Sequence, residues 1–336
     1  EIAHNLAIKA IKYNYLPKKK LVNFDLIKTE IFGKTLNNPI GMAAGFDKNA
    51  EVYNELFNLN FGFVEVGTIT PKSQYGNDKP RIFRLEEDSA LINRLGFNNK
   101  GAENIFSRIS SNSPKGLLGI NIGPNKETTN RIEDYLLCFR KFHKLADYIT
   151  INISSPNTEN LRSFHNHEEL DELLNLIQNE KVNLNSKTPL AVKVSPDLND
   201  KNIEIVSDIL IKNNIDIAII SNTTDSNRDN LKNINRLEKG GLSGKPLEKI
   251  SNTIIKKFYN HLKNKIFIIG VGGVDSGQSA YDKIASGANL IQLYTGMVFK
   301  GPEIAYKISS ELINILKSKG FKNISEAVGI QKSTWL

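Results

Sequence analysis

Cysteine is almost absent from this chain of 336 residues, in which Cys138 is the single example. One thiol excludes a disulfide framework, and it also excludes any zinc or iron–sulfur site held by several thiolates of this chain. Cys138 lies in the helical pattern of residues 132–142, where we expect it to be a buried structural thiol. The 5 histidines show no spacing typical of a metal site, so no metal is predicted.

Long apolar runs are also lacking, and none is long enough to span a bilayer. The formal net charge is +8, but 36 acidic residues are interspersed among the 44 lysines and arginines, and no recognised nucleic-acid motif accompanies them. We therefore predict no nucleic-acid partner. The chain begins with Glu1 rather than Met, so we expect the natural protein to continue beyond this end.

Short apolar runs alternate regularly with helix-length amphipathic segments. Eight of these runs have the pattern of buried strands, at residues 39–44, 62–68, 116–122, 147–153, 189–194, 216–221, 265–271 and 289–294. Eight strands, each followed by a helical pattern or a long connection, predict an α/β fold closed into a (β/α)8 TIM barrel. An open dinucleotide-binding sheet would require a glycine fingerprint that residues 41–45 lack. The connection 69–115 is expected to contain a small inserted hairpin at 79–85.

Polar side chains follow these strands at their carboxyl ends, where parallel α/β proteins bind ligands. They are Lys48, Thr68, Asn121, Asn152, Lys193 and Asn222. Glycines in 270–273, followed by the turn at Tyr294 and Thr295, predict a phosphate cradle, and segment 240–244 is expected to add a flexible, donor-rich loop. The alternative is a set of glycine turns without a ligand. A lysine inside the barrel, as expected for Lys193, requires a negative partner.

The most informative segment is 152–158, with the sequence Asn-Ile-Ser-Ser-Pro-Asn-Thr. Two amides, Asn152 and Asn157, bracket a hydroxyl, which suits a flat hydrogen-bonding ring such as a pyrimidine. Ser155 would then be placed to handle one proton. The alternative is a strand that ends at a proline, whose serines and asparagines only form turns.

The ordered set of motifs resembles the dihydroorotate dehydrogenases, FMN enzymes of pyrimidine biosynthesis built on a (β/α) barrel. The resemblance runs from about residue 1 to residue 330. Its motifs are Ala-Gly-Phe-Asp-Lys at 44–48, Val-Gly-Thr-Ile-Thr-Pro at 66–71, Gly-Asn-Asp-Lys-Pro-Arg at 76–81, Asn-Arg-Leu-Gly-Phe at 93–97, the segment 152–158, Ser-Asn-Thr-Thr at 221–224, and the glycine and tyrosine turns at 240–244, 270–273 and 294–295. Each motif alone is weak, but their order is highly specific.

The resemblance implies oxidation of (S)-dihydroorotate to orotate, in de novo synthesis of UMP, with hydride transfer to FMN. FMN would be bound by Ala44, Gly45, Phe46, Asp47, Lys48, Thr68, Asn121, Asn152, Lys193, Ser221, Gly244, Gly273, Tyr294 and Thr295. The substrate would be bound by Lys48, Asn93, Arg94, Leu95, Gly96, Phe97, Asn152, Asn157, Asn222 and Thr223. Ser155 would be the base, with a water beside Thr158 as its proton outlet and Phe97 covering the site.

The resemblance also indicates a class, because soluble members carry cysteine at the base position and the membrane-associated, quinone-reducing class carries serine. We therefore expect residues 1–37 to form an N-terminal helical extension lining a quinone tunnel, ahead of a catalytic barrel at 38–336. The extension has an apolar helical stripe and lysines for anionic lipid headgroups, namely Ile2, Ala3, Leu6, Ala7, Ala10, Ile11, Lys9, Lys12 and Lys18–Lys20. The alternative is a helix that caps the barrel floor.

His4, Arg84 and Tyr294 would face the quinone by position in that class. The implied location is peripheral, on the cytoplasmic face of a bacterial inner membrane, or on the mitochondrial inner membrane in a eukaryote. One departure from the family is Glu159-Asn160, which stands where Pro-Gly usually follows and puts lid kinetics, not the chemistry, in doubt.

Two other functions remain open from the sequence. One is a different FMN-barrel reductase acting on dihydropyrimidines or dihydrouridine with a nicotinamide donor, although such enzymes generally use a cysteine base and often iron–sulfur partners. The other is a non-catalytic barrel that binds a phosphorylated ligand. The colour of the purified protein discriminates between them, because an oxidised flavin is yellow.

Overall fold

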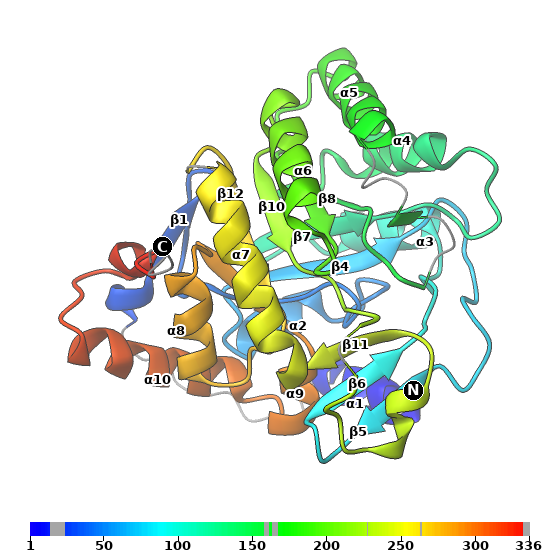
Figure 1. Ribbon diagram of the computed structural model, residues 1–336. Helices are drawn as coiled ribbons and strands as arrows, with labels where there is room; N and C mark the ends of the chain where they lie inside the picture. The colour runs from blue at the N-terminus through cyan, green and yellow to red at the C-terminus, as the bar shows by residue number, and fades with distance from the viewer. Residues whose placement is uncertain (14–23, 158–160, 163–166, 227, 263, 332–336) are drawn as a thin grey trace.

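The computed structural model describes residues 1–13, 24–157, 161–162, 167–226, 228–262 and 264–331. Eight parallel strands form a closed barrel (Figure 1). They are β3 (Ile40–Met42), β4 (Phe63–Ile69), β7 (Leu117–Ile122), β8 (Tyr148–Asn152), β9 (Leu190–Val194), β10 (Ile217–Ile220), β12 (Phe267–Val271) and β13 (Leu290–Leu293). Every strand lies within its predicted range except for the last residue of β4, Ile69. The predicted TIM barrel is therefore confirmed.

Helices surround the barrel (Figure 1). They are α2 (Tyr53–Asn58), α3 (Ala102–Ser111), α4 (Arg131–Phe142), α5 (His167–Asn183), α6 (Asp200–Lys212), α7 (Glu248–Leu262), α8 (Gly277–Ala285), α9 (Thr295–Lys300) and α10 (Ile304–Ser318). Their amphipathic faces bury apolar side chains against the strands, as Ile255 and Phe258 of α7 do. Cys138 is fully buried in α4, as predicted, and burial raises the pKa of its thiol.

The barrel interior is apolar at the amino-terminal ends of the strands. Inward-facing side chains such as Phe63 and Tyr148 fill it, and a Cβ at Gly41 or Gly119 would overlap one of these two rings. The floor is closed by an antiparallel hairpin, β1 (Thr29–Ile31) and β2 (Lys34–Leu36), which follows the short helix η1 (Asp25–Ile27). The stretch 24–36 is therefore packed on the barrel.

A three-stranded antiparallel sheet stands over the opposite end of the barrel. The predicted hairpin is present, but it extends beyond the predicted range 79–85, because β5 (Ile82–Leu85) pairs with β6 (Ala90–Asn93). Its third strand is β11 (Gly241–Gly244), so the expectation of a flexible loop at 240–244 is wrong. Glycine is required here because a Cβ at Gly241 would lie 1.9 Å from the Thr223 hydroxyl oxygen. The short helix η3 (Ile234–Leu237) packs on β5.

The N-terminal helix α1 (Ile2–Lys12) lies beside this small sheet, at the end of the molecule away from β1 (Figure 1). Ile11 is 3% exposed and packs on the main core, whereas Ile2 is 80% and Leu6 60% exposed. The expected apolar stripe is thus divided between an inward and an outward face. Among the described residues, no helix combines the length and apolarity that crossing a membrane requires.

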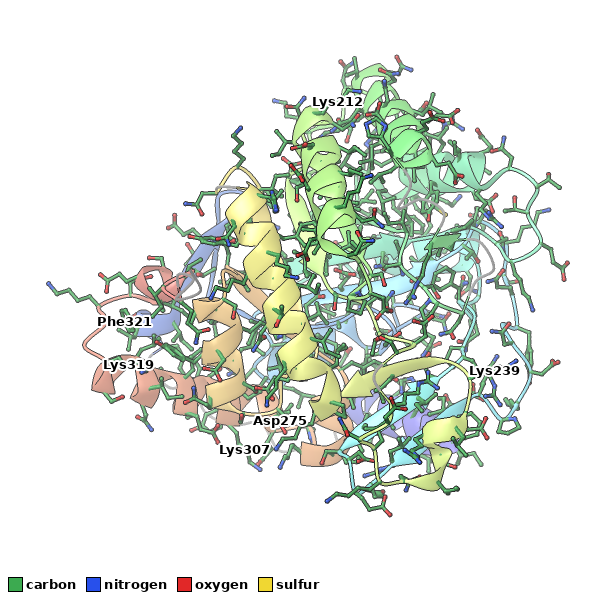
Figure 2. All side chains as sticks on the ribbon, in the orientation of Figure 1. Lys212, Lys239, Asp275, Lys307, Lys319 and Phe321 are labelled. Atoms are coloured by element: carbon green, nitrogen blue, oxygen red, sulfur yellow. The ribbon has the colours of Figure 1, made fainter. Side chains whose placement is uncertain are left out.

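Side chains that carry nitrogen or oxygen project from the outer helices and loops on all sides of this view (Figure 2). The labelled lysines Lys212, Lys239, Lys307 and Lys319 lie on separate edges of this view. In this orientation the four lysines therefore do not gather into one basic patch.

Candidate active site

A deep pocket opens at the carboxyl ends of the barrel strands, under the small sheet, and encloses about 1270 Å³ of space including its open mouth. The predicted residues on its wall are Ala44, Gly45, Lys48, Thr68, Asn93, Leu95, Gly96, Phe97, Asn152, Ser155, Asn157, Lys193, Ser221, Asn222, Thr223, Gly244, Gly273, Tyr294 and Thr295. Parallel strands place their carboxyl ends at one rim, which explains how residues so distant in sequence meet there.

Several predicted residues lie behind this wall. The carboxylate of Asp47 is buried and accepts hydrogen bonds from the backbone N–H groups of Glu51 and Val52, at 2.7 and 2.8 Å. Burial raises the pKa of Asp47 to about 6, and the hydrogen bonds oppose this. Arg94 forms an ion pair with Glu238 at 2.8 Å. Both side chains therefore hold loops in place. Thr158 and Glu159-Asn160 lie outside the described residues.

A buried carboxylate at the barrel centre organises the pocket floor. Glu65 on β4 has no exposed surface and accepts hydrogen bonds from Asn121 (2.8 Å), Tyr148 (2.9 Å) and Gln292 (3.0 Å). No sequence motif pointed to Glu65. Its signal was an acidic residue at an inward position of an otherwise apolar strand, which a barrel interior tolerates only when the charge is paired.

Lys193 on β9 extends into the pocket above this carboxylate. Its side chain is 6% exposed, and its ammonium group makes no hydrogen bond to another described residue. Burial lowers the pKa of Lys193, and the charge of Glu65 opposes that shift. Lys193 therefore presents unused donors to a ligand, while Glu65 supplies the nearby negative charge that the sequence analysis required.

We expect Glu65→Leu to destabilise the fold by about 3–5 kcal/mol, because it leaves Lys193 and three polar groups buried without their partner. Urea denaturation at neutral pH measures this loss as a lower midpoint. Glu65→Gln is the matched control, since it keeps the shape and an acceptor, and its loss should be smaller. A leucine variant with the same midpoint as the unchanged protein would contradict the role assigned to Glu65.

The amide of Asn152 is held rigidly beside the pocket. Its Nδ2 donates to Thr68 Oγ1 at 3.0 Å and to Asn121 Oδ1 at 3.3 Å. Thr68 in turn donates to Asn121 Oδ1 at 2.6 Å. Asn121 does not line the pocket, and it therefore acts by orienting Thr68 and Asn152. Its own Nδ2 donates to Glu65, which connects these two residues to the buried carboxylate.

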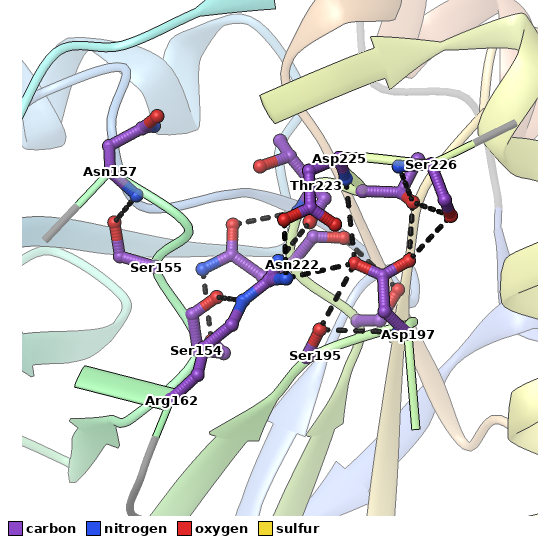
Figure 3. Close-up of polar contacts among 12 residues, drawn as sticks. Ser154, Ser155, Asn157, Arg162, Ser195, Asp197, Asn222, Thr223, Asp225 and Ser226 are labelled. Atoms are coloured by element: carbon purple, nitrogen blue, oxygen red, sulfur yellow. Dashed lines mark hydrogen bonds and ion pairs between the residues drawn. The ribbon is translucent and has the colours of Figure 1, made fainter. Parts of the chain in front are cut away.

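The two serines after β8 have different surroundings (Figure 3). Ser154 donates to Asn152 Oδ1 at 2.9 Å and accepts from Asn222 Nδ2 at 2.9 Å, so its hydroxyl is committed to the protein. Ser155 accepts from the backbone N–H of Asn157 at 3.2 Å and lies on the pocket wall. Among the described residues nothing accepts the Ser155 proton, which leaves that hydroxyl available to a ligand.

Arg162 joins the loop that carries these serines to neighbouring strand ends (Figure 3). It donates to the carbonyl of Ser154 at 3.4 Å and to that of Thr223 at 3.2 Å. It also forms ion pairs of 3.1 Å with Asp197 and Asp225. Arg162 was not among the predicted site residues, because no motif marks a residue whose partners follow two other strands.

Lys48 is a cation at the rim of the pocket. Its Nζ donates to the carbonyl of Gly45 at 2.6 Å, and burial lowers its pKa to about 8. Nearby, the Asn157 amide donates to Asn93 Oδ1 at 3.4 Å, and the buried Oδ1 of Asn98 has no partner among the described residues. A cation surrounded by amides suits an anionic ring that carries both donors and acceptors.

The glycine turn after β12 and the residues after β13 close the other side of the pocket. Gly272 and Gly273 have φ angles of +119° and +75°, which favour glycine. A Cβ at Gly273 would lie 2.5 Å from Glu248 Cβ, so close packing against α7 also requires glycine here. Thr295 donates to Ser243 Oγ of β11 at 2.9 Å, which ties the small sheet to this turn.

An aromatic cluster lies where α1 meets the pocket. The ring of His4 packs against Phe46 at 5.4 Å and Tyr294 at 6.4 Å between centroids. Burial lowers the pKa of His4 to about 4, so its ring is neutral at pH 7. Arg84 instead pairs with Glu86 and stacks on Phe299, and among the described residues no hydrogen bond, ion pair or ring contact joins it to His4 or Tyr294.

Comparison with known proteins shows which family this chain is similar to. The family model described as dihydroorotate dehydrogenase matches residues 26–316. The chain is 43% identical to a dihydroorotate dehydrogenase (quinone) of Bartonella henselae, over 96% of this chain and 90% of that protein. It is 42% identical to the mitochondrial dihydroorotate dehydrogenase (quinone) of Mus musculus, over 98% and 86%.

Two solved structures of DHODH from Eimeria tenella are similar throughout. The ligand-free structure has a TM-score of 0.96 and covers 99% of both chains. The complex with ferulenol has a TM-score of 0.94 and covers 98% of this chain and 94% of that one. Both are 36% identical in sequence to this chain, and the similarity includes the segments outside the barrel as well as the barrel itself.

Proposed function

The chain belongs to the dihydroorotate dehydrogenase family, and we propose that it oxidises (S)-dihydroorotate to orotate in pyrimidine biosynthesis and passes the electrons to a membrane quinone. The observation that carries this proposal is the available hydroxyl of Ser155 on the pocket wall. The same pocket is lined by Lys48 and several asparagine amides at its rim, and by the amine of Lys193 inside the barrel. Each of these groups has a part in the reaction.

The pocket fits FMN as cofactor. The ammonium of Lys193, from which no described residue accepts a hydrogen bond, offers hydrogen bonds to a heterocycle, while the Asn152 amide and the Thr68 hydroxyl form a fixed polar wall beside it. The turns at Gly273 and Thr295 would hold its phosphate. The other residues assigned to FMN are Ala44, Gly45, Phe46, Lys48, Ser221, Gly244 and Tyr294, with Asn121 acting through Thr68 and Asn152 and with Asp47 acting through its loop. When bound, FMN supplies the hydride acceptor of the reaction.

The substrate is assigned to the amide-rich rim. Lys48 forms an ion pair with the carboxylate of dihydroorotate, and Asn93, Asn157 and Asn222 form hydrogen bonds with its cyclic urea. The remaining contacts are Leu95, Gly96, Phe97, Asn152 and Thr223, with Arg94 acting through its loop. Phe97 has a φ angle of +52°, a conformation that bulky residues rarely adopt and that often occurs at functional sites.

Ser155 is assigned as the base. It takes the proton from one ring carbon while the hydride leaves its neighbour, so that a double bond forms between the two carbons. A serine hydroxyl is a weak base, and it requires both a proton outlet and stabilised negative charge on the ring. Lys48 and the asparagines supply the second, and Thr158 with a water is assigned to the first.

The quinone is assigned to the place where α1 packs on the barrel and the rings of His4 and Tyr294 meet. The outward face of α1 supports a peripheral membrane contact, because it exposes Ile2, Leu6 and Lys9, and Tyr13 directly after the helix is exposed too. Arg84 would reach this site only by leaving Phe299. A bacterial protein of this class would attach to the cytoplasmic face of the inner membrane, and a mitochondrial one to the inner mitochondrial membrane.

The experiment that tests the function follows bound flavin in the purified protein. Dihydroorotate should bleach the yellow oxidised flavin, and a short-chain quinone should restore it within the turnover time. Orotate should accumulate in equal amount to the quinone consumed. A colourless protein, or a flavin that NADH reduces and dihydroorotate does not, would overturn the proposal.

A chain that begins at Phe24 should lose quinone reduction while keeping flavin reduction. The cut removes α1 and retains η1 and the β1–β2 hairpin, which close the barrel floor. We expect reoxidation by quinone to slow by at least about tenfold, because the wall that carries His4 and Ile8 is lost. Stopped-flow measurement of the two half-reactions separates the effects.

The control is the double variant Ile2→Ser, Leu6→Ser in the full chain, which changes the exposed face of α1 alone. It should bind anionic lipid vesicles less tightly and still reduce a soluble quinone at the original rate. Equal quinone rates in the shortened and full-length proteins would contradict the assignment of the tunnel.

A further inference from the structure

A buried amine lies directly behind the glycine turn after β12. Lys283 on α8 has no exposed surface, and its Nζ donates to Ser251 Oγ at 2.9 Å and to Asn252 Oδ1 at 2.7 Å, both on α7. Among the described residues no carboxylate lies within 4.0 Å of this amine. An unpaired charge in such a place is costly, so a nearby anion would stabilise it.

Ser251 connects Lys283 to the backbone of the turn. Because Ser251 accepts from the amine, it uses its own proton to donate to the carbonyl of Val271, at 2.5 Å. The same carbonyl accepts from the backbone N–H of Ser221 at 3.1 Å. In a planar trans peptide the N–H points opposite to the carbonyl, so the N–H of Gly272 is turned away from α7. It has no backbone acceptor among the described residues.

The glycines of the turn allow this approach from behind. A Cβ at Gly270 would lie 2.6 Å from Lys283 Cγ, and one at Gly272 would lie 3.1 Å from Ser251 Cβ. Val271, Gly272 and Gly273 also line the pocket on the front of the turn. One short stretch of backbone thus separates the buried amine from the ligand space.

We propose that Lys283 is a positioning residue for the flavin phosphate, which fixes the Val271–Gly272 peptide through Ser251 and supplies the buried positive charge that a phosphate dianion requires. The inference rests on the proposed function, since it requires a phosphorylated cofactor at this turn. The field of the amine acts through a region of low dielectric and is weakly screened there. Lys283 therefore favours a flavin that carries the phosphate over one that lacks it, and it does not contact the flavin ring.

Proton linkage follows from the charges around the amine. Burial lowers the pKa of Lys283 to about 7, and the negative charges of Glu248 on α7 and Asp282 on α8 partly oppose this. From α10, Glu311 is occupied with the backbone N–H of Gly277. At pH 8 the amine is therefore mostly neutral in the ligand-free protein. A phosphate dianion raises its proton affinity, so binding should take up a proton.

The test compares two flavins that differ only in the phosphate. Full-length protein depleted of flavin is titrated with FMN and with riboflavin, and quenching of flavin fluorescence gives each affinity. Lys283→Met should weaken FMN binding by about 10–100-fold and leave riboflavin binding within about twofold. Lys249→Met, which removes an exposed lysine from the first turn of α7, is the matched control and should change neither affinity.

Equal losses for FMN and riboflavin, or no loss for either, would overturn the inference and leave FMN as cofactor untouched. If the unchanged protein bound riboflavin as tightly as FMN, the phosphate site itself would be wrong, and the cofactor assignment would fail with it. Should Lys283→Met not fold, calorimetry on the unchanged protein decides. FMN binding at pH 8 should take up protons and riboflavin binding should not, and equal proton uptake would overturn the inference.

Discussion

Ser155→Ala should slow reduction of the bound flavin by dihydroorotate by about 10²–10⁴-fold, while FMN and orotate still bind. The alanine removes the pocket-facing hydroxyl whose proton no described residue accepts, and it leaves Asn152 and Thr68 in their hydrogen bonds. Stopped-flow recording of flavin absorbance measures the single-turnover rate. The perturbation of the flavin spectrum by orotate measures binding independently of the chemistry.

Two further variants separate proton transfer from structure. Ser155→Cys retains a group that can move a proton, so it should keep partial activity with a lower pH optimum, because a thiol has a lower pKa than a hydroxyl. Ser154→Ala removes the link between Asn152 and Asn222 and should mainly weaken binding. A reduction rate for Ser155→Ala within about tenfold of the unchanged protein would show that Ser155 is not the base.

Lys48→Met should weaken orotate binding by about 10²–10³-fold, because the substrate carboxylate would then be buried without its charged partner. In the unchanged protein the affinity should be constant below pH 7 and fall above pH 8. The sign follows from the pKa of Lys48, which burial lowers to about 8, so that the binding cation is lost as the pH rises. Spectral titration with orotate between pH 6 and 10 measures both effects.

The matched control is Lys100→Met, which removes an exposed lysine that pairs with Glu51 at 3.2 Å. It should leave both the affinity and its pH profile unchanged. In Lys48→Met the decline above pH 8 should disappear. A methionine variant that binds orotate normally, or that retains the alkaline decline, would assign the carboxylate to another cation.

Local patterns were enough to locate the strands and much of the pocket. A buried strand has a continuous apolar run, and a turn at its carboxyl end has polar residues or glycine, and both signals lie within a few neighbouring residues. This is why the eight strands were found where the sequence predicted them, and why residues predicted at strand ends, such as Lys48, Ser155 and Gly273, line one pocket. The same reasoning failed at 240–244, because glycines predict freedom where pairing with β6 imposes a strand.

Long-range contacts could not be obtained in this way. Glu65 and Gln292 are 227 positions apart, and only closure of the barrel brings the carboxylate and the amide together. The face of α1 that packs inward was also undetermined, since alanine and isoleucine occur on both sides of the helix and only contact with the barrel buries Ile11.

The sequence by itself determined that this chain forms a (β/α)8 barrel, which residues stand at its strand ends, and that a serine, Ser155, stands where the family resemblance predicts the base. Those properties depend on periodicity and on residue type, which are written locally. The tertiary structure alone decided that Ser154 is committed to Asn152 while Ser155 is available, and that Lys283 lies behind the glycine turn after β12. Hydrogen-bond partners and burial belong to the packed state, because they arise only when elements distant in sequence meet.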